Sequence, residues 1–225
     1  MLSYITTYLL MLLYYSFFFK AVKTSFKKSS GQLKDILSGK GRPDILFTKL
    51  ISGIFLLGFG TVTLFEKRNV DLEIFTPVWN DYDTSVWMII AGATIIGTLS
   101  AFKKIYPSNN SFHSLPFYLP LSFVFVRTLF LIVYESFFRG VVLFVMIEDF
   151  GLVPAVIVNL ILYALLHWFD KKERYGSLIM GVILCSVSIN YQSIWPAIII
   201  HLSLALSHEI TLLINNKSLI KKSLS

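Results

Sequence analysis

The sequence predicts an all-α, polytopic membrane protein whose helices cross the bilayer about seven times in one bundle. Hydrophobic residues make up 55% of the 225 residues and charged residues only 15%. Soluble domains carry about 25% charged residues, and here the charges lie in short clusters between long apolar stretches. We therefore expect lipid to be the solvent of most side chains.

The apolar stretches are predicted to be helices. A helix of about twenty apolar residues spans the hydrocarbon core, whereas an open sheet edge would leave backbone groups unpaired in lipid. The runs also lack the alternation of a membrane β-barrel. The predicted spans lie near residues 3–19, 46–65, 84–102, 120–147, 151–168, 176–190 and 194–214.

Basic residues in the short loops predict the orientation, because lysine and arginine favour the cytoplasmic side. Seven alternating spans place the following basic residues on one side: Lys20, Lys23, Lys27, Lys28, Lys34, Lys40, Arg42, Lys103, Lys104, Lys171, Lys172, Arg174, Lys217, Lys221 and Lys222. The other side is mainly acidic and holds Glu66, Asp71, Glu73, Asp81, Asp83, Glu148 and Asp149, with Lys67 and Arg68. We expect the N-terminus outside, the C-terminus in the cytoplasm, and residues 20–44 to form an amphiphilic cytoplasmic loop.

Few ionisable side chains lie inside the predicted spans. Charge in hydrocarbon is costly, so those that occur there usually face the bundle interior and mark function. In the last four spans they are Arg127, Glu135, Arg139, His167, His201, His208 and Glu209. We expect Arg127, near the start of its span, to extend to the cytoplasmic interface without a functional role.

Glu135 and Arg139 are four residues apart, so they share a helical face and are predicted to form an ion pair. The pair fits a structural role in a buried helix as well as a polar active site. His167 shares a face with Tyr163, and His201 lies inside the last span. One glutamate and two histidines from three spans can supply acid, base and oxyanion stabiliser, or bind zinc.

Three stretches carry a resemblance to a known family: Glu135-Ser-Phe-Phe-Arg139-Gly140, Tyr163-x-x-x-His167 and Ser193-Ile-Trp-Pro-Ala-Ile-Ile-Ile-His201. In this order they resemble the CAAX protease and bacteriocin-processing family (CPBP, Abi) of intramembrane proteases. Its pattern is Glu-Glu-x-x-x-Arg, Phe-x-x-x-His and His-x-x-x-Asn on three helices. The resemblance implies a protease core at residues 116–225, preceded at 1–115 by three further helices and the basic loop.

The resemblance also implies roles for single residues. Glu135 and His167 would activate water, His201 would stabilise the oxyanion, and Arg139 and Tyr163 would support them. Two positions depart from the pattern, since Tyr134 replaces the first glutamate and Ala205 replaces the asparagine. Ser203, Ser207 or His208 are candidates to help His201 in place of that asparagine.

The implied function is an intramembrane endopeptidase that acts on a peptide or protein entering the bilayer of a bacterial inner or plasma membrane. A prenylated substrate and a zinc ion on Glu135, His167 and His201 are both left open. The alternatives are a membrane scaffold that lost catalysis, favoured by Tyr134 and Ala205, and a transporter with a proton relay. The chain lacks a nucleic-acid fold signature, so its partners are expected to be lipid and substrate.

Depth along the helices raises one difficulty. Straight, untilted helices would place Glu135 at mid-membrane, His167 near the cytoplasmic end and His201 in the outer half. Tilt, which averages about 20° for transmembrane helices, or a shifted start of the seventh helix is able to bring the three side chains together.

The predicted orientation is tested by protease protection. A tag appended to Ser225 is expected to resist protease added to intact cells and to be digested after lysis, because the C-terminus is predicted to be cytoplasmic. A tag before Met1 serves as the control and should be digested in intact cells. Digestion of the Ser225 tag in intact cells would contradict the prediction.

Overall fold

The computed structural model describes residues 2–68, 72–77, 82–105 and 118–219, and these residues form helices and connecting turns. The all-α prediction is confirmed for this part of the chain. Several predicted features lie outside the described residues: the domain boundary at 115/116, and Asp71, Asp81, Lys221, Lys222 and Ser225 of the predicted topology.

Each predicted span corresponds to a helical segment. The segments are α1 (Leu2–Lys27), α3 (Pro43–Arg68), α4 (Thr84–Ala101), α7 (Leu152–Leu166), α8 (Lys171–Tyr191) and α9 (Trp195–Asn215), and a continuous helix made of α5 (Leu119–Glu135), η3 (Ser136–Val142) and α6 (Leu143–Phe150). Among the described helices, five are long and apolar enough to cross a membrane: α1, α3, α4, the continuous α5–α6 helix and α9. α7 is apolar but shorter.

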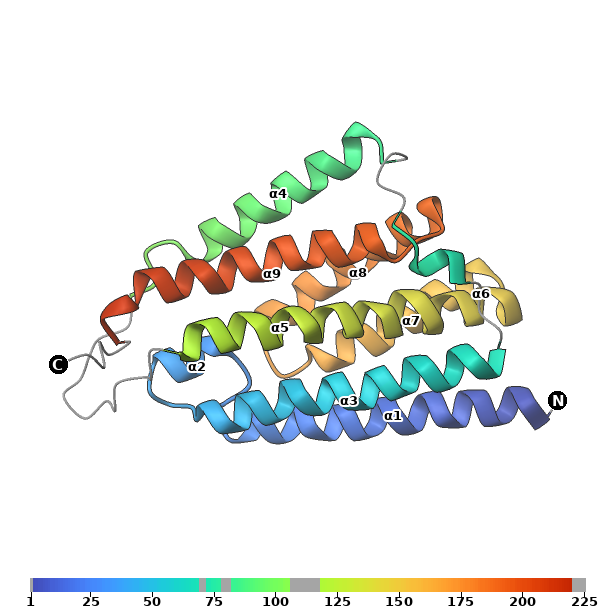
Figure 1. Cartoon of the computed structure of the whole chain (residues 1–225), viewed down its shortest axis with the longest axis horizontal. Helices are drawn as coiled ribbons and strands as arrows, with labels where there is room; N and C mark the ends of the chain where they lie inside the picture. Colours follow the sequence, from blue (N-terminus) through green and yellow to red (C-terminus); the bar gives the residue numbers. More distant parts are fainter. Residues whose placement is uncertain (1, 69–71, 78–81, 106–117, 220–225) are drawn as a thin grey trace.

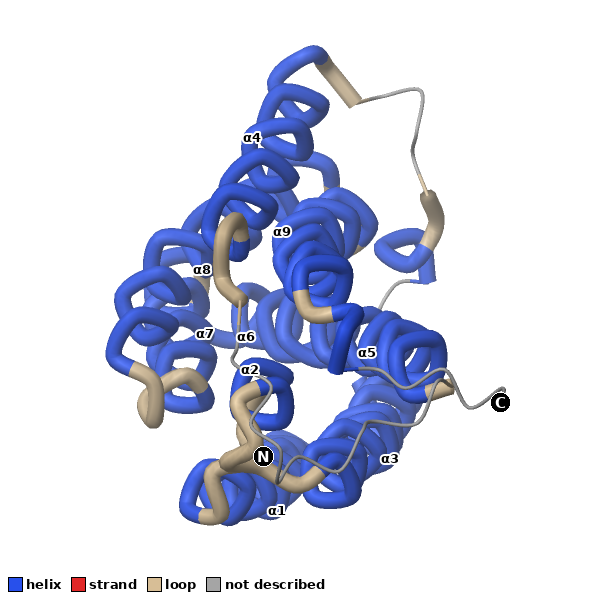
Figure 2. The backbone as a smooth tube through the Cα atoms, turned by 90° about the vertical axis from the view of Figure 1, so that its left-hand side faces the viewer, coloured by secondary structure: helices blue, strands red, loops and turns tan. Residues whose placement is uncertain are grey.

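The continuous helix from α5 to α6 lies at the centre of the bundle (Figures 1 and 2). It packs on α3 and α9, while α1 packs on α3 and α4 packs on α9 at the periphery. Of the apolar 18-residue stretch within this helix, 83% is buried, against 22–28% of the corresponding stretches in the other four candidate spans. The outer helices therefore present large apolar side chains on their outward faces, as a lipid environment requires.

The segment expected to be an amphiphilic loop, residues 20–44, is more ordered than the sequence predicts. α1 continues to Lys27, and a short helix α2 (Leu33–Leu37) follows, with Leu33, Ile36 and Leu37 buried. Figure 2 looks along the bundle from this end and shows α2 inside its outline. The prediction of a loop was wrong here. Three of the five residues of α2 are apolar, and packing them against the helix ends is more favourable than leaving them exposed to solvent.

The opposite end of the bundle is held by a cluster around Asp149. Arg68 of α3 donates two hydrogen bonds to this carboxylate, of 2.7 and 2.6 Å, and the Tyr8 hydroxyl of α1 donates a third of 2.5 Å. A bidentate arginine–carboxylate pair is one of the stronger polar contacts. The cluster ties α1, α3 and α6 together.

α4 approaches α9 closely at Gly97. A Cβ atom added there would overlap with the Ser207 hydroxyl and the Leu204 carbonyl oxygen. Ala93 and Ala101, four residues before and after it, are also buried. Small residues spaced by four allow membrane helices to pack backbone to backbone, so this stripe positions α4.

The Gly97→Ala variant is expected to lose about 1–3 kcal/mol of stability in detergent, because the added methyl group forces α4 away from α9. Gly92→Ala is the matched control on the same helix, since no heavy atom lies within 4 Å of its added Cβ. Thermal unfolding followed by circular dichroism measures both. Equal stability of the two variants would contradict the close packing.

Candidate active site

The candidate site is built around Glu135, the last residue of α5. The helix then widens into a π-helical turn, η3, in which the Leu143 amide donates to the Phe138 carbonyl five residues earlier. The sequence predicted an uninterrupted α-helix over 120–147. Such turns are rare in proteins, and those that occur often lie at functional sites. The wider turn rotates the side chains that follow it relative to those that precede it.

The Glu135 carboxylate has two partners and is fully buried. Oε1 lies 2.5 Å from Nδ1 of His201, and Oε2 lies 3.5 Å from Nε of Arg139, which is also fully buried. The predicted Glu135–Arg139 ion pair is confirmed. The direct contact with His201 shows that the helix arrangement removes the expected difference in depth between these two residues.

Asn159 of α7 holds Arg139 in place, and sequence reasoning missed it. Its Oδ1 accepts a hydrogen bond of 2.7 Å from Nη1 of Arg139, and its Nδ2 donates one of 2.7 Å to the Phe138 carbonyl. Asn159 is fully buried. A lone amide in an otherwise apolar span was the available signal, because a polar side chain in lipid needs an internal partner.

Aromatic rings connect the predicted site residues of three helices. The ring of Tyr163 lies 5.0 Å from that of His167, 5.6 Å from that of Tyr134 and 6.3 Å from that of His201, as centroid distances. The Arg139 guanidinium lies over the Tyr163 ring at 4.4 Å. The structure therefore brings six of the seven predicted residues, those from Tyr134 to His201, into one neighbourhood.

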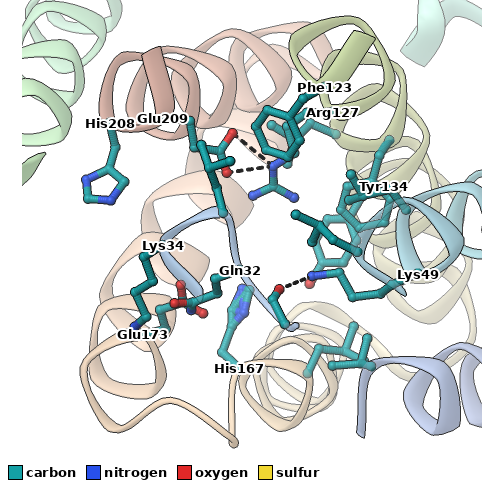
Figure 3. Close-up of a pocket in the computed structure, with 18 of the residues that line it drawn as sticks. Gln32, Lys34, Lys49, Phe123, Arg127, Tyr134, His167, Glu173, His208 and Glu209 are labelled. Carbon is teal, nitrogen blue, oxygen red and sulfur yellow. Dashed lines mark hydrogen bonds and ion pairs between the residues drawn. The ribbon is translucent and has the colours of Figure 1, made fainter. Parts of the chain in front are cut away.

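A cavity of about 120 Å³ lies beside this cluster (Figure 3). Tyr134, His167 and His201 line it, whereas Glu135 lies behind His201 and is not part of the cavity wall. Within the described residues, Glu135 makes no hydrogen bond to His167. In this arrangement, Glu135 therefore influences a molecule in the cavity through His201 rather than by direct contact.

The rest of the cavity wall combines apolar side chains with charged ones that the sequence did not predict to meet there. Arg127 donates to the Glu209 carboxylate at 3.0 Å, which links α5 to α9, and Lys49 donates to the Gly31 carbonyl (Figure 3). The expectation that Arg127 extends to the interface stays a prediction, and the partly buried carboxylate of Glu209 on the neighbouring helix gives its guanidinium a partner that offsets desolvation. Lys34 and Glu173 also line the cavity.

The proposed helpers of His201 are directed elsewhere. His208 Nδ1 lies 2.6 Å from the Ser100 hydroxyl on α4, although His208 also borders the cavity. The Ser207 hydroxyl donates to the Leu204 carbonyl of its own helix at 3.1 Å. A helper role for either residue stays a prediction.

The residues do not fit a zinc site with one glutamate and two histidines. Zinc bridging two ligands sits about 2 Å from each, so the ligand atoms lie about 3 Å apart or more. Glu135 Oε1 and His201 Nδ1 are closer, at 2.5 Å, and point at each other. In the described part of the chain, no three His, Cys, Asp or Glu side chains form a group suited to a metal ion.

Comparison with known protein families identifies this region. Residues 116–206 match the family described as type II CAAX prenyl endopeptidase Rce1-like. The match contains Tyr134, Glu135, His167 and His201, so the resemblance inferred from the motifs is confirmed. Comparison with curated proteins and with solved structures yields no significant match.

The network behind the site makes a prediction about stability. Asn159→Leu is expected to lower the free energy of unfolding by about 2–4 kcal/mol, because Arg139 then keeps buried donors without an acceptor. Ser188→Ala is the matched control, since its hydroxyl is buried and lacks a hydrogen-bond partner among the described residues. Unfolding in detergent measures both, and equal stability of the variants would contradict the role assigned to Asn159.

Proposed function

Because residues 116–206 belong to the type II CAAX prenyl endopeptidase Rce1-like family, we propose that this chain is an intramembrane endopeptidase. It hydrolyses a peptide bond of a membrane-associated peptide or protein. The observation that carries the proposal is the 2.5 Å contact between the buried Glu135 carboxylate and His201, beside a cavity that His167 also lines.

The contact supports His201 as the group that takes the proton from water. With the ring proton on Nδ1, His201 donates to Glu135 and keeps a lone pair on Nε2. A carboxylate that fixes the tautomer and orientation of a histidine in this way makes it an effective general base. The same ring then returns the proton to the leaving amine when the C–N bond breaks.

Motif resemblance assigned Glu135 and His167 to water activation and His201 to the oxyanion. The contacts favour a different division, in which Glu135 acts through His201, because His201 lines the cavity and Glu135 does not. His167 lines the cavity as well and is positioned to donate to the substrate carbonyl oxygen. Each such donor is commonly worth about 3 kcal/mol in the transition state.

Arg139 is proposed to keep the Glu135 carboxylate charged and in place. Its guanidinium offsets the cost of burying that carboxylate, and Asn159 fixes the guanidinium in turn. The arginine is not part of the cavity wall. Its role is therefore positional.

We further propose that the chain crosses the membrane seven times, with α7 and α8 as the shorter crossings, and that residues 116–225 form the protease core. The lysine and arginine residues gathered in the loops on one side support an outside N-terminus and a cytoplasmic C-terminus in a bacterial inner or plasma membrane. The cavity is lined by Gly31 to Lys34 of the predicted cytoplasmic loop. Substrate would then reach His201 from the cytoplasmic half of the bilayer.

The rival function is a scaffold that binds a membrane partner without cleaving it. Tyr134 in place of glutamate and Ala205 in place of asparagine favour it. Activity measurements on purified protein separate the two, since a scaffold has no turnover to lose.

The proposal is tested with two fluorogenic peptides in proteoliposomes, one with a farnesylated cysteine three residues before its free C-terminus and one without the lipid. Wild type is expected to cleave at least one of them. Glu135→Gln and His201→Gln are expected to lower kcat by about 10³–10⁴, and His167→Ala by about 10². Gly92→Ala, distant from the site, is the control that should cleave like wild type.

Equal cleavage by wild type and all three site variants would contradict the assigned residues. No cleavage of either peptide by wild type would contradict hydrolysis of this substrate class and favour the scaffold.

A further inference from the structure

The hydroxyl of Tyr134 stands out among the buried polar groups of the site. Tyr134 is 3% exposed, and its hydroxyl lacks a hydrogen-bond partner within the described residues. The neighbours of its ring are other rings: Phe138 at 4.7 Å, Phe130 at 5.5 Å, Tyr163 at 5.6 Å and His201 at 6.1 Å. A buried donor without an acceptor costs free energy, so its retention needs a reason.

The position of the hydroxyl offers that reason. Tyr134 lines the same cavity as His167 and His201, and its side chain extends from α5 toward that cavity (Figure 3). It lies in the last turn of α5, directly before Glu135. Contacts on several sides fix the ring, so the O–H group is preorganised rather than free to turn away.

The asparagine position of the family pattern supplies no donor in this chain. Ala205 lies one turn after His201 on the same face of α9 and contributes only a methyl group. Since His201 Nδ1 is occupied by Glu135, His167 is the other ring beside Tyr134 on this wall that is able to donate to a developing oxyanion. Arg127 and Lys49 on the same wall are directed to Glu209 and to the Gly31 carbonyl. A second donor is the usual requirement for hydrolysis of an amide.

We propose that Tyr134 is a catalytic residue that donates its O–H to the carbonyl oxygen of the substrate as that oxygen becomes negative. The inference rests on the proposed function. Water attacks the carbonyl carbon, its proton passes to His201 Nε2, and the carbonyl electron pair moves to the oxygen. Tyr134 holds that oxygen by a hydrogen bond and keeps its own proton. When the C–N bond breaks, the proton on His201 goes to the leaving nitrogen.

The test is Tyr134→Phe, which removes the hydroxyl and keeps the ring. We expect kcat on the peptide that wild type cleaves to fall by about 10²-fold, with KM changed by less than about threefold, because the bond forms in the transition state. We expect an unchanged or higher melting temperature, because the hydroxyl that is removed makes no hydrogen bond to another described residue.

The matched control is Tyr15→Phe. The Tyr15 hydroxyl is buried in the same bundle but donates to the Leu162 carbonyl at 2.9 Å. Its loss should lower the melting temperature and leave kcat unchanged. In the double variant Tyr134→Phe, Ala205→Asn, an amide one turn beyond His201 supplies a new donor, and we expect it to recover about tenfold in kcat.

If wild type is active and Tyr134→Phe has the same kcat as wild type, this inference is overturned while the proposed function stands. A fall in kcat accompanied by a matching fall in melting temperature would show a structural role and would overturn it too. An inactive wild type would overturn the proposed function and this inference with it.

Discussion

The structure depends on the burial of one carboxylate. Glu135 is fully enclosed by helices, and an uncompensated charge there would cost more free energy than most single contacts supply. Arg139 and His201 supply the compensation, and each brings further structure with it. Arg139 requires Asn159 of α7, and His201 requires that α9 cross α5 at this depth. The carboxylate thus fixes the mutual position of three helices.

That enclosure also separates roles within the site. Glu135 has no access to the cavity, whereas His201, His167 and Tyr134 face it. In the proposed function, the buried charge therefore orients a histidine, and the groups on the wall meet the substrate. The second ion pair, Arg127 with Glu209, and Lys49 make another part of the same cavity polar. A peptide backbone, which carries unpaired polar groups in lipid, would find partners there.

Sequence reasoning recovered the helices because long apolar runs in lipid have few alternatives to a helix. It also singled out Glu135, Arg139, His167 and His201, since ionisable residues are rare in such runs; the structure brings these side chains together, and their roles stay predictions. It missed the π-helical turn, in which Phe137 and Phe138 are fully buried, and it missed α2. The partner of Arg127 and the position of Asn159 depend on how helices cross, and a pattern along one helix does not contain that information.

The central claim is that Glu135 and His201 act as one unit in hydrolysis. The most direct measurement is kcat for Glu135→Gln, His201→Gln and the double variant on one cleaved peptide. Residues that act as a unit give strongly non-additive losses, so the account predicts that the double variant is about as slow as His201→Gln alone. Losses that multiply in the double variant would contradict it.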